Sequence, residues 1–121
     1  MKEIKLRTPV KCDKGHFNYL YYSVTNGYVK DVRYAYPLCD CKNAEAYKQC
    51  CDDELWTGLK DIENTDIYEN DIIAIDGMKL TPMGTVKWYH AGFIIETKEG
   101  HSIITNPIIY KIIGNIHEGV E

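Results

Sequence analysis

The side chains best suited to metal binding or nucleophilic chemistry in this 121-residue chain are its five cysteines and four histidines. Four of the cysteines fall in two close pairs: Cys39 and Cys41, then Cys50 and Cys51. Together with Cys12 and His16 upstream, they offer enough thiolate and imidazole groups for a tetrahedral zinc site. Structural zinc sites usually use two C-x-x-C knuckles, however, and neither pair has that spacing.

The cysteines are therefore predicted to be free thiols around a short helix, with no cofactor bound. The alternative is a zinc ion, for which the candidate ligands are Cys39, Cys41, Cys50 and Cys51. The odd number of cysteines agrees with reduced thiols, and alternating residues follow Met1 where an export signal would have an apolar core. We expect a cytoplasmic protein.

No arrangement typical of an enzyme is found in the sequence. All four histidines fall in expected turns or near the C-terminus, and Cys12 with His16 is the one nucleophile and base pair that lie close in sequence. Nucleophile-elbow, zinc-protease and phosphate-binding glycine motifs are missing. The prediction is a protein without catalytic residues, cofactor-binding residues or a small-molecule substrate.

Length and composition fit one domain, with an N-terminal portion over residues 1–55 and a second portion over 56–121. Ten tyrosines against two phenylalanines, among many β-branched residues, favour sheet surfaces. No apolar run approaches the length of a membrane span, so no membrane partner is expected.

The net charge of −4 is unevenly distributed. Residues 1–36 carry seven bases and three acids, a net +4, while residues 37–121 carry seven bases and fifteen acids, a net −8. This asymmetry favours pairing between the two parts, within one chain or between copies. A solvated surface without a partner is the alternative.

The N-terminal portion reads as a strand followed by a hairpin. Residues 2–7 alternate as an edge strand does, residues 9–15 are a polar turn, and 17–25 and 28–36 flank Asn26-Gly27, a strong two-residue hairpin signal. The predicted cross-strand pairs are Thr25 with Tyr28, Val24 with Val29, and Tyr21 with Val32.

That register gives the hairpin two partly aromatic faces. One face carries Tyr19, Tyr21, Tyr28, Val32 and Tyr34; the other carries Leu20, Tyr22, Val24 and Val29. We expect the hairpin to pack on both sides, against the core and against a neighbouring subunit. The interface candidates are Tyr19, Tyr21, Tyr28 and Tyr34. Alternatively, the tyrosines only keep their hydroxyls in water at the rim.

The remaining chain predicts one short helix and a series of strands. Local propensity favours a helix around residues 43–50, capped by Asn43. Strands are expected over 72–75, 86–89, 93–97, 102–105 and 108–113, and a frayed end after residue 116. Asp71, just before its strand, is expected to bind backbone N–H groups of the turn. Such a meander closes into a small barrel.

Three segments carry a family resemblance: Trp56-Thr57-Gly58-Leu59-Lys60-Asp61, Ile67-Tyr68-Glu69-Asn70-Asp71-Ile72 and Ile113-Gly114-Asn115-Ile116. In order and spacing they resemble the YopX family of phage and prophage proteins, as does the opening over residues 1–7. The motif residues, read as structural, are Thr57, Gly58, Leu59, Asp61, Ile67, Tyr68, Asp71, Gly114 and Asn115. Asn64 and Asn70 stand where the family commonly has glycine, and asparagine tolerates the left-handed conformation best after glycine.

The resemblance implies a mainly β fold, with the N-terminal hairpin packed on an SH3-like barrel, and it implies self-association but no activity. The sequence therefore predicts a non-enzymatic binding or assembly protein, encoded by a phage or prophage, with a homo-oligomer or another protein as its partner. The alternative is a nucleic-acid-binding accessory protein that uses the basic, tyrosine-rich N-terminal face.

Overall fold

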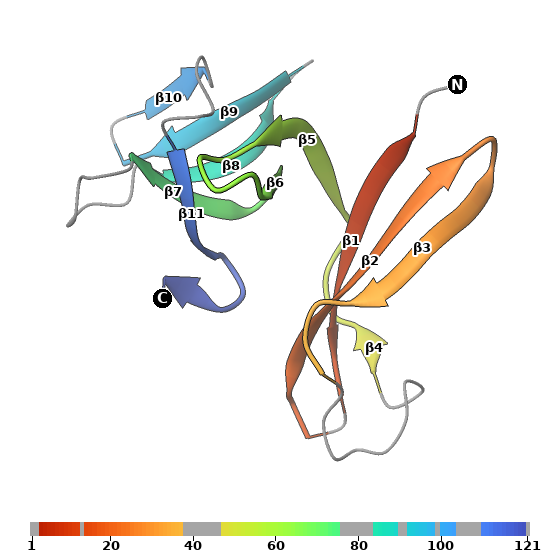
Figure 1. The fold of residues 1–121 in the computed structure, drawn as a ribbon. Helices are drawn as coiled ribbons and strands as arrows, with labels where there is room; N and C mark the ends of the chain where they lie inside the picture. The colour runs from red at the N-terminus through yellow and green to blue at the C-terminus, as the bar shows by residue number, and fades with distance from the viewer. Residues whose placement is uncertain are drawn as a thin grey trace. The chain divides into compact units, whose positions relative to one another are not determined.

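A computed structural model describes residues 3–12, 14–37, 47–75, 84–89, 92–98, 100–103 and 110–120 of the chain. In these ranges the structure is all β, with strands in two antiparallel sheets, which confirms the mainly β prediction (Figure 1). The chain divides into two compact units, residues 1–55 and residues 56–121, and each is described by itself.

The first sheet has the strand order β3-β2-β1-β5-β6, with β4 also paired to β1. Its strands are β1 (Ile4–Lys11), β2 (Phe17–Thr25), β3 (Tyr28–Tyr34), β4 (Lys48–Gln49), β5 (Glu54–Lys60) and β6 (Asp66–Tyr68). β5 passes from the first unit into the second, because its first two residues pair with β1 and its later residues pair with β6.

The second sheet has the order β10-β9-β8-β7-β11-β12. Its strands are β7 (Asp71–Ile75), β8 (Gly84–Tyr89), β9 (Gly92–Thr97), β10 (Gly100–Ile103), β11 (Tyr110–Asn115) and β12 (Gly119–Val120). Among the described strands β10 and β12 are the two ends of an open sheet, so the predicted SH3-like barrel closure is not found there. The end of the chain, expected to fray, instead pairs with β11 as β12.

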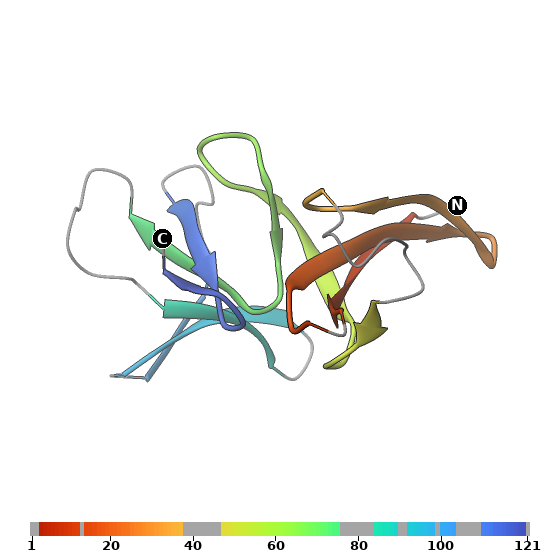
Figure 2. The same cartoon turned by 90° about the horizontal axis from the view of Figure 1, so that it is seen from below.

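The core of the second unit lies between its sheet and the chain from β5 to β6. The buried residues of this core are Ile67, Ile73, Val86, Ile95 and Tyr110. Leu59, Phe93 and Ile112 pack against them and are partly buried. Figures 1 and 2 both show the β5–β6 segment beside β11, in agreement with the hydrogen bond from the Ile62 N–H to the Tyr110 carbonyl (2.9 Å).

The hairpin of β2 and β3 has the predicted turn. Asn26 and Gly27 both adopt positive φ, 53° and 81°, which is the geometry of a type I′ turn. The two pairs nearest the turn are as predicted. Further along, a bulge with Asp31 at φ 56° adds one residue to β3, so Tyr21 pairs with Arg33 and not with Val32.

Two expectations for the N-terminal portion were wrong. β1 continues through the predicted turn to Lys11, and Pro9 pairs with Tyr19 inside it. The Pro9 carbonyl accepts from the Cys50 N–H at 3.0 Å, so it points away from β2. The Pro9 nitrogen points to the same side, and a proline therefore fits here because no N–H is missing from the pairing of β1 with β2. β1 was also expected to be an edge strand, but it lies between β2 and β5 in its sheet. Residues 54–60 form β5, in which Gly58 (φ 87°) stands at a register shift.

The helix predicted around residues 43–50 is wrong where the structure describes it. Lys48 and Gln49 form β4 and pair with Lys11 and Val10 of β1. Helix propensity amounts to a few tenths of a kcal/mol per residue, and pairing with a neighbouring strand overrides it. Residues 43–46 lie outside the described ranges.

Gly84 of β8 is required by a close approach of the backbone. A Cβ atom at this position would overlap the backbone carbonyl oxygen of Glu96. We therefore expect Gly84→Ala to lower the free energy of unfolding of the second unit by about 2–3 kcal/mol. Trp56 and Trp88 both belong to that unit, so tryptophan fluorescence during urea denaturation measures its stability.

The matched control is Gly92→Ala in the neighbouring strand β9, where a Cβ would meet no atom within 4 Å. We expect this variant to unfold at nearly the wild-type urea concentration. Equal unfolding midpoints for the two variants would contradict the packing seen at Gly84.

Candidate binding surface

The sheet of the first unit brings exposed aliphatic side chains together on one face. The registers place Ile4, Val24 and Val29 in one row across β1, β2 and β3. Val32 turns to the same face, because its neighbour Arg33 is paired with Tyr21 on the opposite one and side chains alternate along a strand. These four residues, Ile4, Val24, Val29 and Val32, are called the apolar strip.

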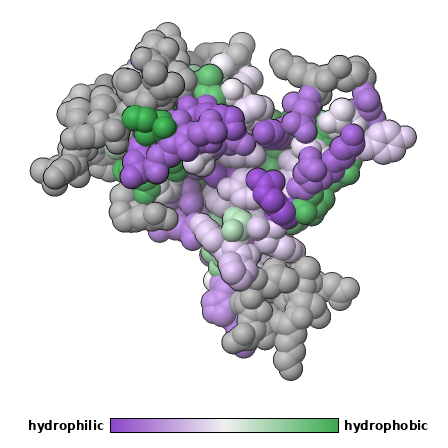
Figure 3. All heavy atoms as spheres, viewed as in Figure 1, coloured by the Kyte–Doolittle hydropathy of each residue, from purple (hydrophilic) through white to green (hydrophobic). Residues whose placement is uncertain are grey.

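Three residues of the apolar strip are largely open to solvent. The exposed fractions are 49% for Ile4, 61% for Val29 and 58% for Val32. Hydrophobic side chains gather over the β2–β3 hairpin in Figure 3, with hydrophilic residues around them. Single exposed aliphatic residues are common on proteins, but adjacent ones on one sheet face are typical of an interaction surface.

β3 is the outermost strand of its sheet, and its backbone edge is protected against pairing with another strand. The bulge at Asp31 interrupts the regular row of N–H and C=O groups, and Lys30 and Arg33 place charge along the strand. Bulges and charged side chains are the features by which natural sheets prevent edge-to-edge association. β3 is therefore open to contact through its apolar face, whereas its backbone edge is protected from pairing with another strand.

The opposite face of the same sheet is basic and aromatic. One row across it is Lys5, Ser23 and Lys30, and the next contains Tyr21 and Arg33. The Arg33 guanidinium carbon lies 4.7 Å from the centroid of the Tyr21 ring, within the range of a cation–π contact. This face gathers the positive charge that the sequence places in residues 1–36.

The four predicted interface tyrosines do not share one surface. Tyr28 is 71% exposed and Tyr21 is half-buried, both on the basic face. Tyr19 is 2% exposed and lies under Arg7, whose guanidinium carbon is 4.0 Å from the ring centroid. Tyr34 pairs with Leu20 because of the bulge, so it lies on the other face, with its ring 5.5 Å from that of Tyr47.

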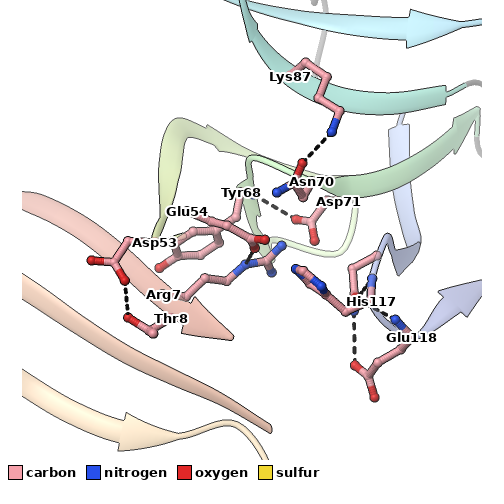
Figure 4. A network of polar contacts seen from close by, with 11 residues as sticks. Arg7, Thr8, Asp53, Glu54, Tyr68, Asn70, Asp71, Lys87, His117 and Glu118 are labelled. Atoms are coloured by element: carbon pink, nitrogen blue, oxygen red, sulfur yellow. Dashed lines mark hydrogen bonds and ion pairs between the residues drawn. The ribbon is translucent and has the colours of Figure 1, made fainter. Parts of the chain in front are cut away.

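Two neighbouring carboxylates, those of Asp53 and Glu54, accept hydrogen bonds from side chains of β1 and β2 (Figure 4). Glu54 of β5 accepts a charge-assisted hydrogen bond from the buried Arg7 Nε at 2.7 Å. Asp53 accepts from the Thr8 hydroxyl at 2.6 Å and from the Tyr22 hydroxyl at 2.7 Å. Burial, followed by this bond to Asp53, raises the pKa of Tyr22 and keeps its hydroxyl a donor.

The family motif of the second unit begins with a hydroxyl and a carboxylate that satisfy backbone groups. The Thr57 hydroxyl donates to the Ile67 carbonyl (2.8 Å) and accepts from the Leu59 N–H (3.1 Å). Asp61 is buried, and one of its oxygens accepts from the N–H groups of Glu63 and Thr65, both at 2.9 Å. Its other oxygen accepts from the Ile112 N–H at 3.0 Å.

The middle of the motif is a turn between β6 and β7. The Asp71 carboxylate accepts from the Tyr68 N–H at 2.8 Å, as predicted for an acid in this position. Asn70 adopts φ 72°, and its side chain accepts from the Lys87 ammonium at 2.8 Å (Figure 4). Asn64 likewise adopts φ 65°, so asparagine takes the left-handed conformation at both positions where the family commonly has glycine.

The last motif segment shapes the end of β11. Register shifts between Ile112 and Gly114, so the strand bulges there. The Asn115 side-chain oxygen accepts from the N–H groups of His117 and Glu118, at 2.9 and 3.0 Å. In the motif, Thr57, Asp61, Asp71 and Asn115 thus bind backbone N–H groups, while Ile67 and Tyr68 are buried.

The candidate zinc ligands are only partly within the described structure. Cys50 and Cys51 are exposed and Cys12 is buried, and none of the three forms a disulfide. Cys39 and Cys41 lie outside the described ranges. Across the residues that the structure describes, no three histidine, cysteine, aspartate or glutamate side chains gather as metal ligands would. A zinc ion on these cysteines stays a prediction.

In the parts of the chain that are described, no helix is both long and apolar enough to cross a membrane. The described strands define an all-β protein with exposed aliphatic side chains on one face of its N-terminal sheet. A family model, that of the YopX protein, matches residues 20–121. The chain belongs to this family, and the match includes three residues of the apolar strip, Val24, Val29 and Val32, but not Ile4. None of the curated proteins compared with the chain matches it.

Substitution of Asp61 tests how much the family motif contributes to the free energy of unfolding. Asp61→Ala would leave three backbone N–H groups without their acceptor, so we expect the second unit to lose about 3 kcal/mol of unfolding free energy. Asp61→Asn keeps one side-chain oxygen and should lose less. Urea denaturation followed by tryptophan fluorescence measures both.

The control for charge is Asp52→Ala, which removes an exposed carboxylate. Its unfolding midpoint should stay at the wild-type value. If Asp61→Ala were no less stable than Asp52→Ala, the three hydrogen bonds would not contribute as described.

Proposed function

We propose that this protein is a non-enzymatic binding or assembly protein that associates with copies of itself through the apolar strip. The observation that carries this proposal is the alignment of Ile4, Val29 and Val32 on one face with exposed fractions of 49%, 61% and 58%. Contact with a matching face removes this surface from water, at about 25 cal/mol for each Å² buried.

A second copy of this chain is the partner that fits the apolar strip best. An apolar strip is complementary to itself, so a two-fold contact between copies uses the same residues on both sides. The charge division of the chain, +4 over residues 1–36 and −8 over the rest, adds attraction between unlike parts of two copies. The YopX resemblance supports an origin in a phage or prophage and a place in the bacterial cytoplasm.

The test is the combined substitution Ile4→Thr, Val29→Thr and Val32→Thr. Threonine keeps the branched shape and strand propensity of valine but replaces a methyl group with a hydroxyl. We expect the wild type to gain mass with concentration in sedimentation velocity. The variant should need at least about tenfold higher concentration, since 1.4 kcal/mol changes an equilibrium constant tenfold.

Ile62→Thr with Ile116→Thr is the matched control, because both residues are exposed aliphatics of the second unit, at 45% and 46%. This control should associate as the wild type does. A wild type that remains monomeric at every concentration would overturn the proposal, and so would a strip variant that associates as tightly as the control.

A second candidate function is binding of single-stranded nucleic acid by the basic face. The supporting observation is that Lys5, Lys30 and Arg33 share this face with Tyr21 and the exposed Tyr28. Proteins that bind single strands combine positive charge along the backbone with aromatic rings on which bases stack. The acidic total of the chain opposes this candidate, so it ranks second.

We expect Lys30→Gln with Arg33→Gln to weaken binding of a labelled single-stranded oligonucleotide, because phosphate contacts release counterions. Fluorescence anisotropy at two salt concentrations measures the affinity. Lys98→Gln with Lys111→Gln, two exposed lysines of the second unit, is the control. Wild-type binding that is undetectable or independent of salt would exclude this function.

A further inference from the structure

The turn of the β2–β3 hairpin joins an asparagine to a glycine at an exposed position. Asn26 and Gly27 are the two turn residues, and both are open to solvent. Of the seven asparagines in the chain, Asn26 is the one that precedes a glycine. Glycine has no Cβ, and a Cβ added to Gly27 would meet no atom within 4 Å. The space around the Gly27 backbone is therefore open.

Three other asparagines are held by hydrogen bonds of their own side chains. The side-chain oxygens of Asn18 and Asn115 accept from backbone N–H groups at 2.8 to 3.0 Å. That of Asn70 accepts from the Lys87 ammonium at 2.8 Å. These bonds keep each amide in place, so its carbon cannot approach the backbone nitrogen of the next residue.

Asn64 provides an internal comparison for Asn26. Both residues are exposed, and both adopt positive φ, 65° at Asn64 and 53° at Asn26. Asn64 is followed by Thr65, whose branched side chain crowds its own backbone nitrogen. The two sites thus share exposure and backbone conformation and differ in the residue that follows.

The closed turn restrains a reaction between Asn26 and Gly27. In a type I′ turn the first central residue has φ and ψ of about 60° and 30°, which holds the next nitrogen away from the side chain. The Asn26 Cα–C bond must rotate before the Gly27 nitrogen reaches the amide carbon. β3 is the outermost strand of its sheet, and loop tips open at a lower free energy than buried strands do. Local opening of the tip permits the rotation.

We propose that Asn26 is a site of spontaneous deamidation, which proceeds when the hairpin tip opens. The Gly27 nitrogen bonds to the Asn26 Cγ, and the bond from Cγ to the amide nitrogen breaks. The proton of the Gly27 N–H ends on that nitrogen, which leaves as ammonia, and a succinimide ring remains. Water then opens the ring at either carbonyl. Residue 26 becomes an aspartate, or an isoaspartate whose backbone continues through the side chain.

Isoaspartate at position 26 changes the strands that the turn positions. It adds one carbon to the backbone between Thr25 and Tyr28, so the two-residue type I′ turn no longer fits. The pair of Val24 with Val29 follows directly behind the turn, and both residues belong to the apolar strip. Deamidation needs no partner. Its effect on the strip rests on the proposed self-association.

The experiment incubates the full chain for several weeks at physiological temperature and neutral pH. Trypsin then releases residues 15–30 as one peptide, and tandem mass spectrometry identifies the residue that has gained one dalton. We expect two chromatographically distinct products of equal mass at Asn26. They should form at least about tenfold faster than any product at Asn64, because glycine leaves the attacking nitrogen unhindered.

Asn26→Gly is the matched control, because Gly-Gly also fits a type I′ turn. It should keep the circular dichroism spectrum of the wild type and lose the mass change in this peptide. In guanidinium chloride the wild type should react at least about threefold faster, since the closed turn no longer restrains it. A rate at Asn26 no higher than at Asn64, or equal rates for the folded and unfolded chains, would refute the proposal.

Sedimentation velocity of the incubated chain separates deamidation from self-association. A wild type that is monomeric before incubation counts against self-association alone, because peptide mapping still measures deamidation. Association that weakens as the modified fraction grows supports the effect on the apolar strip. Association that is unchanged after complete modification would contradict that effect.

Discussion

The second unit depends on one buried carboxylate, that of Asp61. Its two oxygens accept three backbone N–H groups, two in the turn after β5 and one at Ile112 of β11. A backbone N–H removed from water must find an acceptor, and a charged acceptor forms the stronger bond. By joining positions 51 residues apart in the sequence, this side chain fixes the β5–β6 segment against β11.

The same requirement explains why the motif acids are poor candidates for chemistry. Asp71 uses its carboxylate on the Tyr68 N–H, and Asn115 uses its amide on the turn that follows β11. A general base needs a free lone pair aimed at a substrate, whereas these oxygens are directed at the backbone. A run of acids and asparagines close to strands is thus accounted for by turn formation.

The sequence was most informative where one residue determines the backbone. Asn26-Gly27 specifies its hairpin turn, and Asn64 and Asn70 take the positive φ that their glycine-like positions require. The sequence was least informative where the local structure depends on contacts with a strand that is distant in the sequence. Whether residues 48 and 49 pair with β1 depends on the edge that β1 offers, and the need for glycine at position 84 depends on the Glu96 carbonyl.

For the candidate surface, too, one feature could be predicted from the sequence and another could not. Alternation identified Val24 and Val29 as neighbours on one face, and that part of the register is correct. Exposure could not be deduced, because an aliphatic or aromatic residue on a strand fits a core or a surface equally well. Tyr19 was therefore grouped with Tyr28, although one is 2% and the other 71% exposed.

The bulge at Asp31 is a single added residue with two consequences. It moves Val32 onto the face of Val29 and moves Tyr34 away from that of Tyr21, so it separates an apolar face from a basic one. It also interrupts the outer edge of β3, where unprotected strands would pair without limit. Association through a face ends when that face is covered, whereas an open edge can add strands repeatedly. For the self-association proposed here, the bulge thus favours a closed assembly over an extended one.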